Sequence, residues 1–254
     1  MKIVILGGNS KSTFYLYNKL RKKYSIEKII IEKGISKIDF LNTRIKRFGY
    51  LKVFDQILFK IFISNLLNFF SSSRINEIIR EFELDDSPIS NQKILFVDSV
   101  NSQLCRDNLI KLYPDLVLVN GTGIISEKTL NCISTLFINS HVGITPEYRG
   151  VHGAYWALVN NDFENCGVTV HKVDKGIDTG DIIYQETIKI SINDNFATYP
   201  YIQNGIGIKL IEKSIDDFNR NKINFFEKKN VESKLFTHPT FSEYIYNLII
   251  KKVK

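Results

Sequence analysis

Apolar, β-branched runs alternate with helix-like segments over the first half of the chain. The runs lie at residues 2–7, 27–33, 93–99 and 116–121. Helix-like stretches separate them, and the first of these extends from about Ser12 to Lys23. Strands that alternate with helices build a mostly parallel sheet with helices on both faces. The pattern therefore predicts a Rossmann-like α/β fold.

The second half of the chain has closer strands and longer polar loops. Strand-like segments lie at residues 136–141, 167–173 and 181–190, and helical spacing returns between about Ala197 and Phe218. The chain of 254 residues is long enough for one well-buried domain, but its last segment is too short to fold alone. We therefore expect a main domain over residues 1–225 and a short C-terminal extension, 226–254, packed on or beside it.

One apolar segment, residues 61–73, is interrupted by Ser and Asn and is shorter than the ~20 residues that span a bilayer. It predicts a buried helix and no membrane span. An exposed apolar face that pairs subunits or touches a membrane surface is the alternative.

Charge and cysteine content bear on the class of ligand and on the cellular compartment. The net charge of +7 suits a phosphorylated or carboxylate-bearing ligand, although Lys, Ile and Asn are abundant throughout, as a genomic bias would also make them. Cys105, Cys132 and Cys166 lie far apart, without metal-ligand or redox spacing. The N-terminal apolar run is too short for a signal peptide. We therefore expect reduced thiols and a cytoplasmic location.

The turn after the first strand, GGNSKST at residues 7–13, admits two interpretations. One is a structural turn with a Ser or Asn helix cap. The other is a contact with a phosphorylated substrate, because glycines there can bring backbone N–H groups close to a phosphate at a helix start.

Two segments carry candidate chemistry. Asn139 and His141 are two positions apart on a strand, so their side chains leave the same face. An amide N–H can donate to a carbonyl oxygen that becomes an oxyanion, and an imidazole beside it can donate a second bond or move a proton. Further along, Asp174 and Asp178 bracket Gly176 in a tight loop, where a carboxylate can accept a proton from an incoming amine. A structural His and a strand-joining turn are the plain alternatives.

The order of these segments along the chain favours the catalytic interpretation over the plain alternatives. Residues 137–185 resemble the N-terminal domain of the formyltransferase family that uses N10-formyltetrahydrofolate: an N-x-H pair, a Pro-containing loop ending in Gly, the strand GVTVH, and a D-x-G loop. The resemblance implies a formyltransferase-type fold and an enzyme. It also implies the catalytic residues Asn139, His141 and Asp178, with His171 beside them.

The same resemblance implies binding residues. It makes N10-formyltetrahydrofolate the cosubstrate, with no metal. It places the folate beside Thr122, Gly123, Ile124, Ile125, Val173, Asp174 and Gly176. It places the acceptor beside Tyr148, Arg149 and His152, where an Arg fork could hold a sugar diphosphate. Trp156 and His238 are expected to have structural roles.

Several acceptors compete within this family. The methionyl-tRNA enzymes add a C-terminal β-barrel of roughly a hundred residues, for which the tail after about Phe225 is too short, so no nucleic-acid partner is expected. Segment 35–90, the substrate loop and the tail look most like bacterial sugar N-formyltransferases, which act on nucleotide-linked amino sugars in the biosynthesis of O-antigen and other surface glycans. Phosphoribosylglycinamide formyltransferase and a non-catalytic folate- or nucleotide-binding module stay as alternatives. A homodimer stays open as well.

Activity should fall at low pH as the acceptor amine and Asp178 take up protons.

Overall fold

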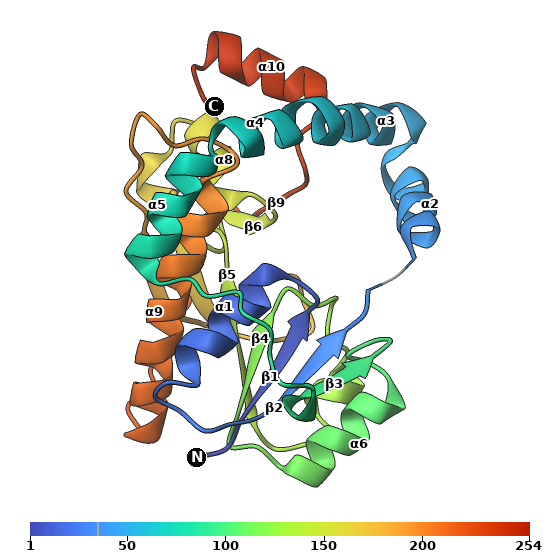
Figure 1. Ribbon diagram of the computed structural model, residues 1–254, viewed down its shortest axis with the longest axis vertical. Coiled ribbons are helices and arrows are strands. Elements are labelled where there is room, and N and C mark those ends of the chain that lie inside the picture. The colour runs from blue at the N-terminus through green and yellow to red at the C-terminus, as the bar shows by residue number, and fades with distance from the viewer. Residues whose placement is uncertain (35) are drawn as a thin grey trace.

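A mixed sheet organises the molecule, whose computed structural model describes residues 1–34 and 36–254. Over these residues, the main sheet has the strand order β3-β2-β1-β4-β5-β7-β8 (Figure 1). The first five strands of that order run parallel, and β7 and β8 are antiparallel to their neighbours. The strands are β1 (Ile3–Gly8), β2 (Ile26–Glu32), β3 (Ile94–Val97), β4 (Leu116–Asn120), β5 (Leu136–His141), β7 (Gly167–Lys172) and β8 (Ile182–Thr187). A second sheet pairs β6 (Tyr148–Gly150) with β9 (Lys234–Phe236).

Helices cover both faces of the main sheet. Figure 1 shows α1, α5 and α9 on one side and α6 on the other. The helical segments are α1 (Lys11–Leu20), α2 (Lys37–Phe48), α3 (Tyr50–Leu58), the π-helical turn η1 (Phe59–Ser64), α4 (Asn65–Phe70), α5 (Ser72–Phe82), η2 (Asn91–Lys93), α6 (Gln103–Leu112), α7 (Glu127–Leu130), α8 (Gly153–Val159), η3 (Phe163–Asn165), α9 (Tyr199–Asn219) and α10 (Phe241–Ile250). The predicted fold class, a Rossmann-like mostly parallel sheet between two helical layers, is confirmed.

Alternation along the central strands explains the two layers. Ile3 and Ile5 of β1 pack into the core that contains α1 and α9, whereas Val4 and Leu6 pack into the core that contains α6. All four side chains are fully buried. A strand buried on both faces reads as a continuous apolar run, so the sequence signal there was strong.

The chain between β2 and α5 departs from expectation. The predicted buried helix at residues 61–73 is wrong, because η1 and α4 are largely exposed: Phe62, Leu66, Phe69 and Phe70 are all more than half exposed. By length and composition alone, the continuous helix Tyr50–Phe70 could span a membrane. Ile35, the first residue of the extra segment, lies outside the described residues.

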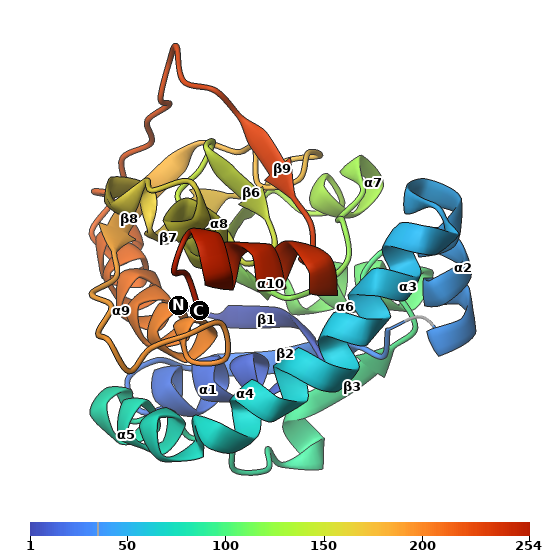
Figure 2. The ribbon, with the colours of Figure 1, turned by 90° about the horizontal axis from the view of Figure 1, so that it is seen from above.

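The last segment of the chain returns to the body in two steps. β9 pairs with β6, and α10 then packs against α3 and η1 (Figure 2). A capping box starts α10: the backbone N–H of Glu243 donates to the Thr240 hydroxyl, and the backbone N–H of Thr240 donates to the Glu243 carboxylate. Residues 226–254 therefore lie against the domain, whereas the assignment of residues 1–225 as the catalytic unit stays a prediction.

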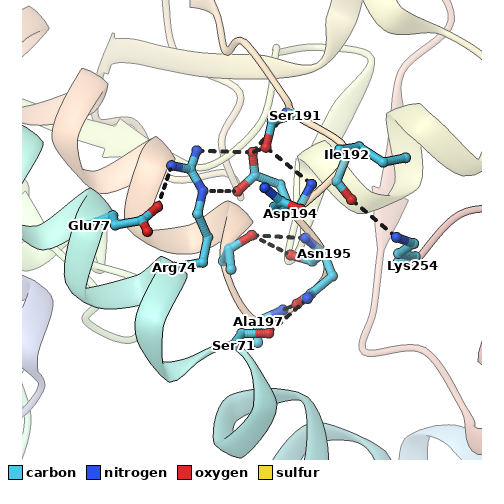
Figure 3. Close-up of polar contacts among 11 residues, drawn as sticks. Ser71, Arg74, Glu77, Ser191, Ile192, Asp194, Asn195, Ala197 and Lys254 are labelled. Atoms are coloured by element: carbon cyan, nitrogen blue, oxygen red, sulfur yellow. Dashed lines mark hydrogen bonds and ion pairs between the residues drawn. The ribbon is translucent and has the colours of Figure 1, made fainter.

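An ion pair joins α5 to the loop that precedes α9 (Figure 3). The Arg74 guanidinium donates from Nε and Nη2 to the two carboxylate oxygens of Asp194, at 2.9 and 3.2 Å. The Asp194 side chain is fully buried and also accepts from the backbone N–H and hydroxyl of Ser191. Asn195 adds a bond to Ser71 at the start of α5. These contacts hold α5 against the loop that precedes α9.

Candidate active site

A cavity of about 480 Å³ opens at the carboxyl ends of β4 and β5. In open α/β sheets this is where ligands bind, next to the point at which the strand order reverses. The lining includes Asn139, His141 and Asp178 together with His171. The structure therefore brings the three predicted catalytic side chains to one cavity, although they come from two separate segments of the chain.

The end of β5 positions His141. The side chain is almost fully buried, and its Nε2 lies 2.9 Å from the carbonyl oxygen of Tyr148. Its Nδ1 lies 3.3 Å from Oδ2 of Asp178. Both neighbours are acceptors, so a ring that carries protons on both nitrogens satisfies both contacts. His141 is thus held between the substrate-side loop and the D-x-G loop.

Asp178 is held in place by His141 and by the backbone of Gly150, and it also lies near His171. Its Oδ2 accepts from the backbone N–H of Gly150 at 3.0 Å, and its Oδ1 lies 3.7 Å from Nε2 of His171. Burial alone would raise the pKa of Asp178, but the contacts with His141, His171 and Gly150 outweigh it and lower the pKa well below its ordinary value. The residue has φ +53°, in the left-handed region that Asn and Asp tolerate best. The carboxylate is a fixed negative charge.

Asn139 lines the same cavity and lies next to His171. Its Nδ2 is 3.2 Å from Nε2 of His171, whose Nδ1 is 2.8 Å from the carbonyl oxygen of Lys172. A carbonyl only accepts, so Nδ1 of His171 is the protonated nitrogen and Nε2 accepts from Asn139. Because an amide nitrogen carries two hydrogens, one N–H of Asn139 remains for a ligand.

A buried polar cluster around Thr169 supports the loop that follows His141, and sequence analysis did not predict it. The Thr169 hydroxyl donates to the carbonyl of Gly143 and accepts from the backbone N–H of Thr145 and from Gln185. A Cβ at Gly143 would lie 2.2 Å from the Tyr148 carbonyl oxygen and 2.8 Å from Nε2 of His141. Only glycine permits the contact between that imidazole and that carbonyl. Thr169 lies within the GVTVH strand, which was the one available signal.

The residues predicted to contact folate all line the cavity: Thr122, Gly123, Ile124, Ile125, Val173, Asp174 and Gly176. Glu32, at the end of β2, fixes this wall by accepting from the backbone N–H groups of Gly123 at 2.7 Å and Val100 at 3.0 Å. Ile124 is 58% exposed, so it presents an apolar surface for a flat ring. Whether folate binds there stays a prediction.

The predicted acceptor residues are placed differently. Tyr148 is buried and donates its hydroxyl to Asp162, and burial raises its pKa to about 12. The ring of His152 packs at 4.4 Å from the Phe196 ring and bonds to His238. Arg149 donates from Nη1 to the carbonyl of Ile177. None of the three lines the described cavity, whereas Gly150 and Val151 of the same loop do. That Tyr148, Arg149 and His152 bind the acceptor stays a prediction.

Polar lining residues that were not anticipated as ligand contacts include Asn120 at the end of β4, and Gln203 and Asn204 on α9. Ser12 at the start of α1 also lines the cavity, and it belongs to the turn at residues 7–13 for which a phosphate contact was one interpretation. Asn120 donates to the hydroxyl of Ser12 at 3.1 Å. Ser10 occupies the N-cap position of α1 without a side-chain bond to the helix, so the predicted Ser cap is not made. Trp156 and His238 have the expected structural roles: the indole donates to the Thr237 carbonyl, and His238 meets His152.

Comparison with known proteins agrees with the fold. Residues 89–201 match a family model described as formyl transferase. A methionyl-tRNA formyltransferase of Halothermothrix orenii is 34% identical over 129 residues, which is 50% of this chain but 40% of that protein. The chain therefore spans less than half the length of this curated relative.

Solved structures share the fold over most of the chain. A 4-N formyltransferase from Francisella tularensis superposes with a TM-score of 0.57 at 19% identity, covering 93% of this chain and 76% of that one. An N-formyltransferase from Helicobacter canadensis, crystallised with folinic acid and dTDP-3-aminofucose, gives a TM-score of 0.51 at 19% identity, covering 93% and 71%. The family-model match shows a formyl transferase segment at residues 89–201, and the solved structures show that the same fold extends over most of the chain.

Proposed function

We propose that this chain transfers the formyl group of N10-formyltetrahydrofolate to the amino group of a nucleotide-linked amino sugar. The observation that carries the proposal is the convergence of Asn139, His141 and Asp178 on one cavity, with the carboxylate 3.3 Å from the imidazole. An amide donor, an imidazole and a buried carboxylate are the groups that an amine attacking an amide-like carbon requires.

Each group has a role in that reaction. The amine nitrogen bonds to the formyl carbon, and the carbonyl oxygen becomes an oxyanion that the free N–H of Asn139 stabilises. The bond from carbon to N10 then breaks, the amine loses a proton and N10 gains one. Asp178 stays ionised and holds His141 at the reacting group, so that the imidazole can pass this proton, directly or through water. The products are the formamide and tetrahydrofolate.

The choice of acceptor rests on the chain outside the shared core. Segment 35–90 and the tail add a helical arm and a β6–β9 pair to the shared core. A sugar N-formyltransferase from Shewanella aligns across 93% of the chain, as does a glycinamide ribonucleotide transformylase from Symbiobacterium toebii, so the choice between these acceptors rests on the added segments. Identity with the methionyl-tRNA relative favours a second candidate acceptor, a charged tRNA. The proposal includes a catalytic unit at residues 1–225 and a cytoplasmic role in surface glycan synthesis.

An acceptor screen tests the proposal. The protein is incubated with N10-formyltetrahydrofolate and either nucleotide-linked amino sugars, glycinamide ribonucleotide or methionyl-tRNA, and product mass is followed. We expect a gain of one formyl unit on an amino sugar. Formylation of another acceptor alone would overturn the sugar assignment, and folate binding without any turnover would indicate a binding module.

A paired variant tests the site itself. Asn139→Ala should lower turnover by about a hundredfold or more, because one oxyanion donor is lost. Asn108→Ala, which removes a half-buried amide that donates to the Leu104 carbonyl within α6, is the matched control and should leave turnover unchanged. Near-normal activity of Asn139→Ala would remove that side chain from the catalytic set.

A further inference from the structure

A stripe of large apolar side chains faces solvent along the helix from Tyr50 to Phe70. Its members recur at intervals of three or four residues, so they share one side of the helix. A helix of this length is roughly 30 Å long. The exposed members are Tyr50, Leu51, Phe54, Ile57, Ile61, Phe62, Leu66, Phe69 and Phe70. A contiguous exposed apolar surface of this size indicates an interaction site.

The opposite side of the same helix belongs to the core of the protein. Val53 and Phe59 are buried, and the Phe59 ring lies 4.9 Å from Phe196 and 5.2 Å from Tyr244. In Figure 2, α10 runs beside this helix, which agrees with its packing on α3 and η1. Because one side is anchored to the folded body, the helix cannot cross a bilayer in this fold. It can only lie along a surface.

The charges around the stripe have one dominant sign. Residues 36–70 contain six basic side chains and two acidic ones: Lys37, Arg44, Lys46, Arg47, Lys52 and Lys60 against Asp39 and Asp55. Lys46, Lys52 and Lys60 are exposed, and none of them forms a salt bridge within residues 1–34 and 36–254. Exposed Lys252 extends the positive charge at the end of α10, next to the exposed Ile249 and Ile250.

We propose that this face, the α2–α4 arm with the outer side of α10, docks on an anionic lipid surface. Aromatic and aliphatic side chains would enter the boundary between headgroups and acyl chains, and the lysines would meet lipid phosphates. A second copy of the chain fits less well, because a symmetric interface would set one positive face against another. In Figure 1 the arm lies at the same end of the molecule as the carboxyl ends of β1 and β2, so docking would bring the cavity end toward the membrane.

Vesicle co-sedimentation tests this inference with the full chain. We expect binding to phosphatidylcholine vesicles that contain about one third phosphatidylglycerol, and little binding to phosphatidylcholine alone. Raising the salt from about 0.1 M to about 1 M should weaken binding severalfold, because screening shortens the range of the lysine charges. The double variant Phe62→Ser/Phe69→Ser should lower partitioning by about tenfold or more.

Matched variants separate lipid binding from other effects. Phe163→Ser removes an equally exposed aromatic ring on η3, outside the arm, and should bind vesicles as the wild type does. Lys46→Gln/Lys52→Gln should weaken binding only to anionic vesicles. All variants should keep the wild-type circular dichroism. Absence of binding to anionic vesicles, or equal binding by Phe62→Ser/Phe69→Ser, overturns the proposal; so does a wild-type dimer that this variant dissociates while vesicles bind neither protein.

Discussion

At the scale of single residues, the site depends on a carboxylate that does not titrate near neutral pH. Three contacts, from His141, His171 and the Gly150 backbone, lower the pKa of Asp178 well below its ordinary value despite burial. The expectation that Asp178 takes up a proton as activity falls on acidification is therefore wrong. An acid loss of activity would come from protonation of the acceptor amine, which must attack in its neutral form.

Asp178→Asn tests this account, because Asn keeps the size and tolerates the left-handed backbone. We expect turnover to fall by about a hundredfold or more as His141 loses its anionic partner. A carboxylate whose pKa is lower in the folded protein than in the unfolded chain stabilises the folded state above the unfolded pKa of about 4. This stabilisation is lost as pH falls below that value. Thermal unfolding of the wild type should therefore lose more stability than the variant below about pH 4. Parallel curves would contradict the fixed charge.

His152, which bonds to His238, gives the stability a second dependence on pH, and here burial rather than polar contacts lowers the pKa. Burial, with a smaller effect from His238, lowers the pKa of His152 to about 3. In the unfolded chain this imidazole binds a proton near its ordinary pKa of about 6.5, whereas in the folded protein it stays neutral. The stability that is present above that pH is therefore lost as pH falls toward about 4.

His152→Asn removes this imidazole at a position with φ +59°, where Asn is tolerated. The expected result is a smaller decrease in unfolding temperature between about pH 6.5 and pH 4 than in the wild type. Lys175→Gln, an exposed change, is the control and should follow the wild-type curve. A decrease in His152→Asn as large as the wild type's would show that this imidazole stays accessible to protons in the folded state.

At the scale of elements, sequence periodicity was informative where a strand is buried on both faces. Residues 136–141 were expected as a strand and are β5, so Asn139 and His141 leave one face as predicted. Periodicity failed for the arm, because it cannot say whether an apolar stripe faces a core or solvent. Periodicity also cannot identify the partners that position Tyr148 and His152, which are Asp162, 14 residues away, and His238, 86 residues away.

The contact between α5 and the loop before α9 is of the same long-range kind, and it is testable. Arg74→Met removes the partner of the fully buried Asp194 carboxylate. An unpaired buried charge is strongly destabilising, so the free energy of unfolding should decrease by about 3–5 kcal/mol. Lys33→Met, which breaks an exposed pair with Asp98, should change it by less than about 1 kcal/mol. Urea denaturation measures both, and similar small effects would mean that Asp194 is satisfied by Ser191 alone.

At the scale of the whole molecule, the tail connects the arm to the cavity. Tyr244 of α10 is almost fully buried, stacks on Tyr155 at 6.0 Å and contacts Phe59 of the arm at 5.2 Å. Upstream of it, β9 pairs with β6, so Gly150, whose N–H holds Asp178, lies in that pairing. The same 29 residues therefore support the helical face and the Asp178 carboxylate.

Tyr244→Ala should release both ends of this connection. Loss of a buried aromatic ring typically costs about 3–5 kcal/mol, and urea unfolding should show a decrease of that size. Tyr246→Ala, two residues away but 57% exposed, should change stability by less than about 0.5 kcal/mol. If β9 loosens with α10, formyl transfer by Tyr244→Ala should also fall at temperatures where the protein remains folded, because the Gly150 N–H then no longer fixes Asp178. Full activity in a destabilised Tyr244→Ala would instead show that the β6–β9 pair holds the carboxylate without help from the last helix.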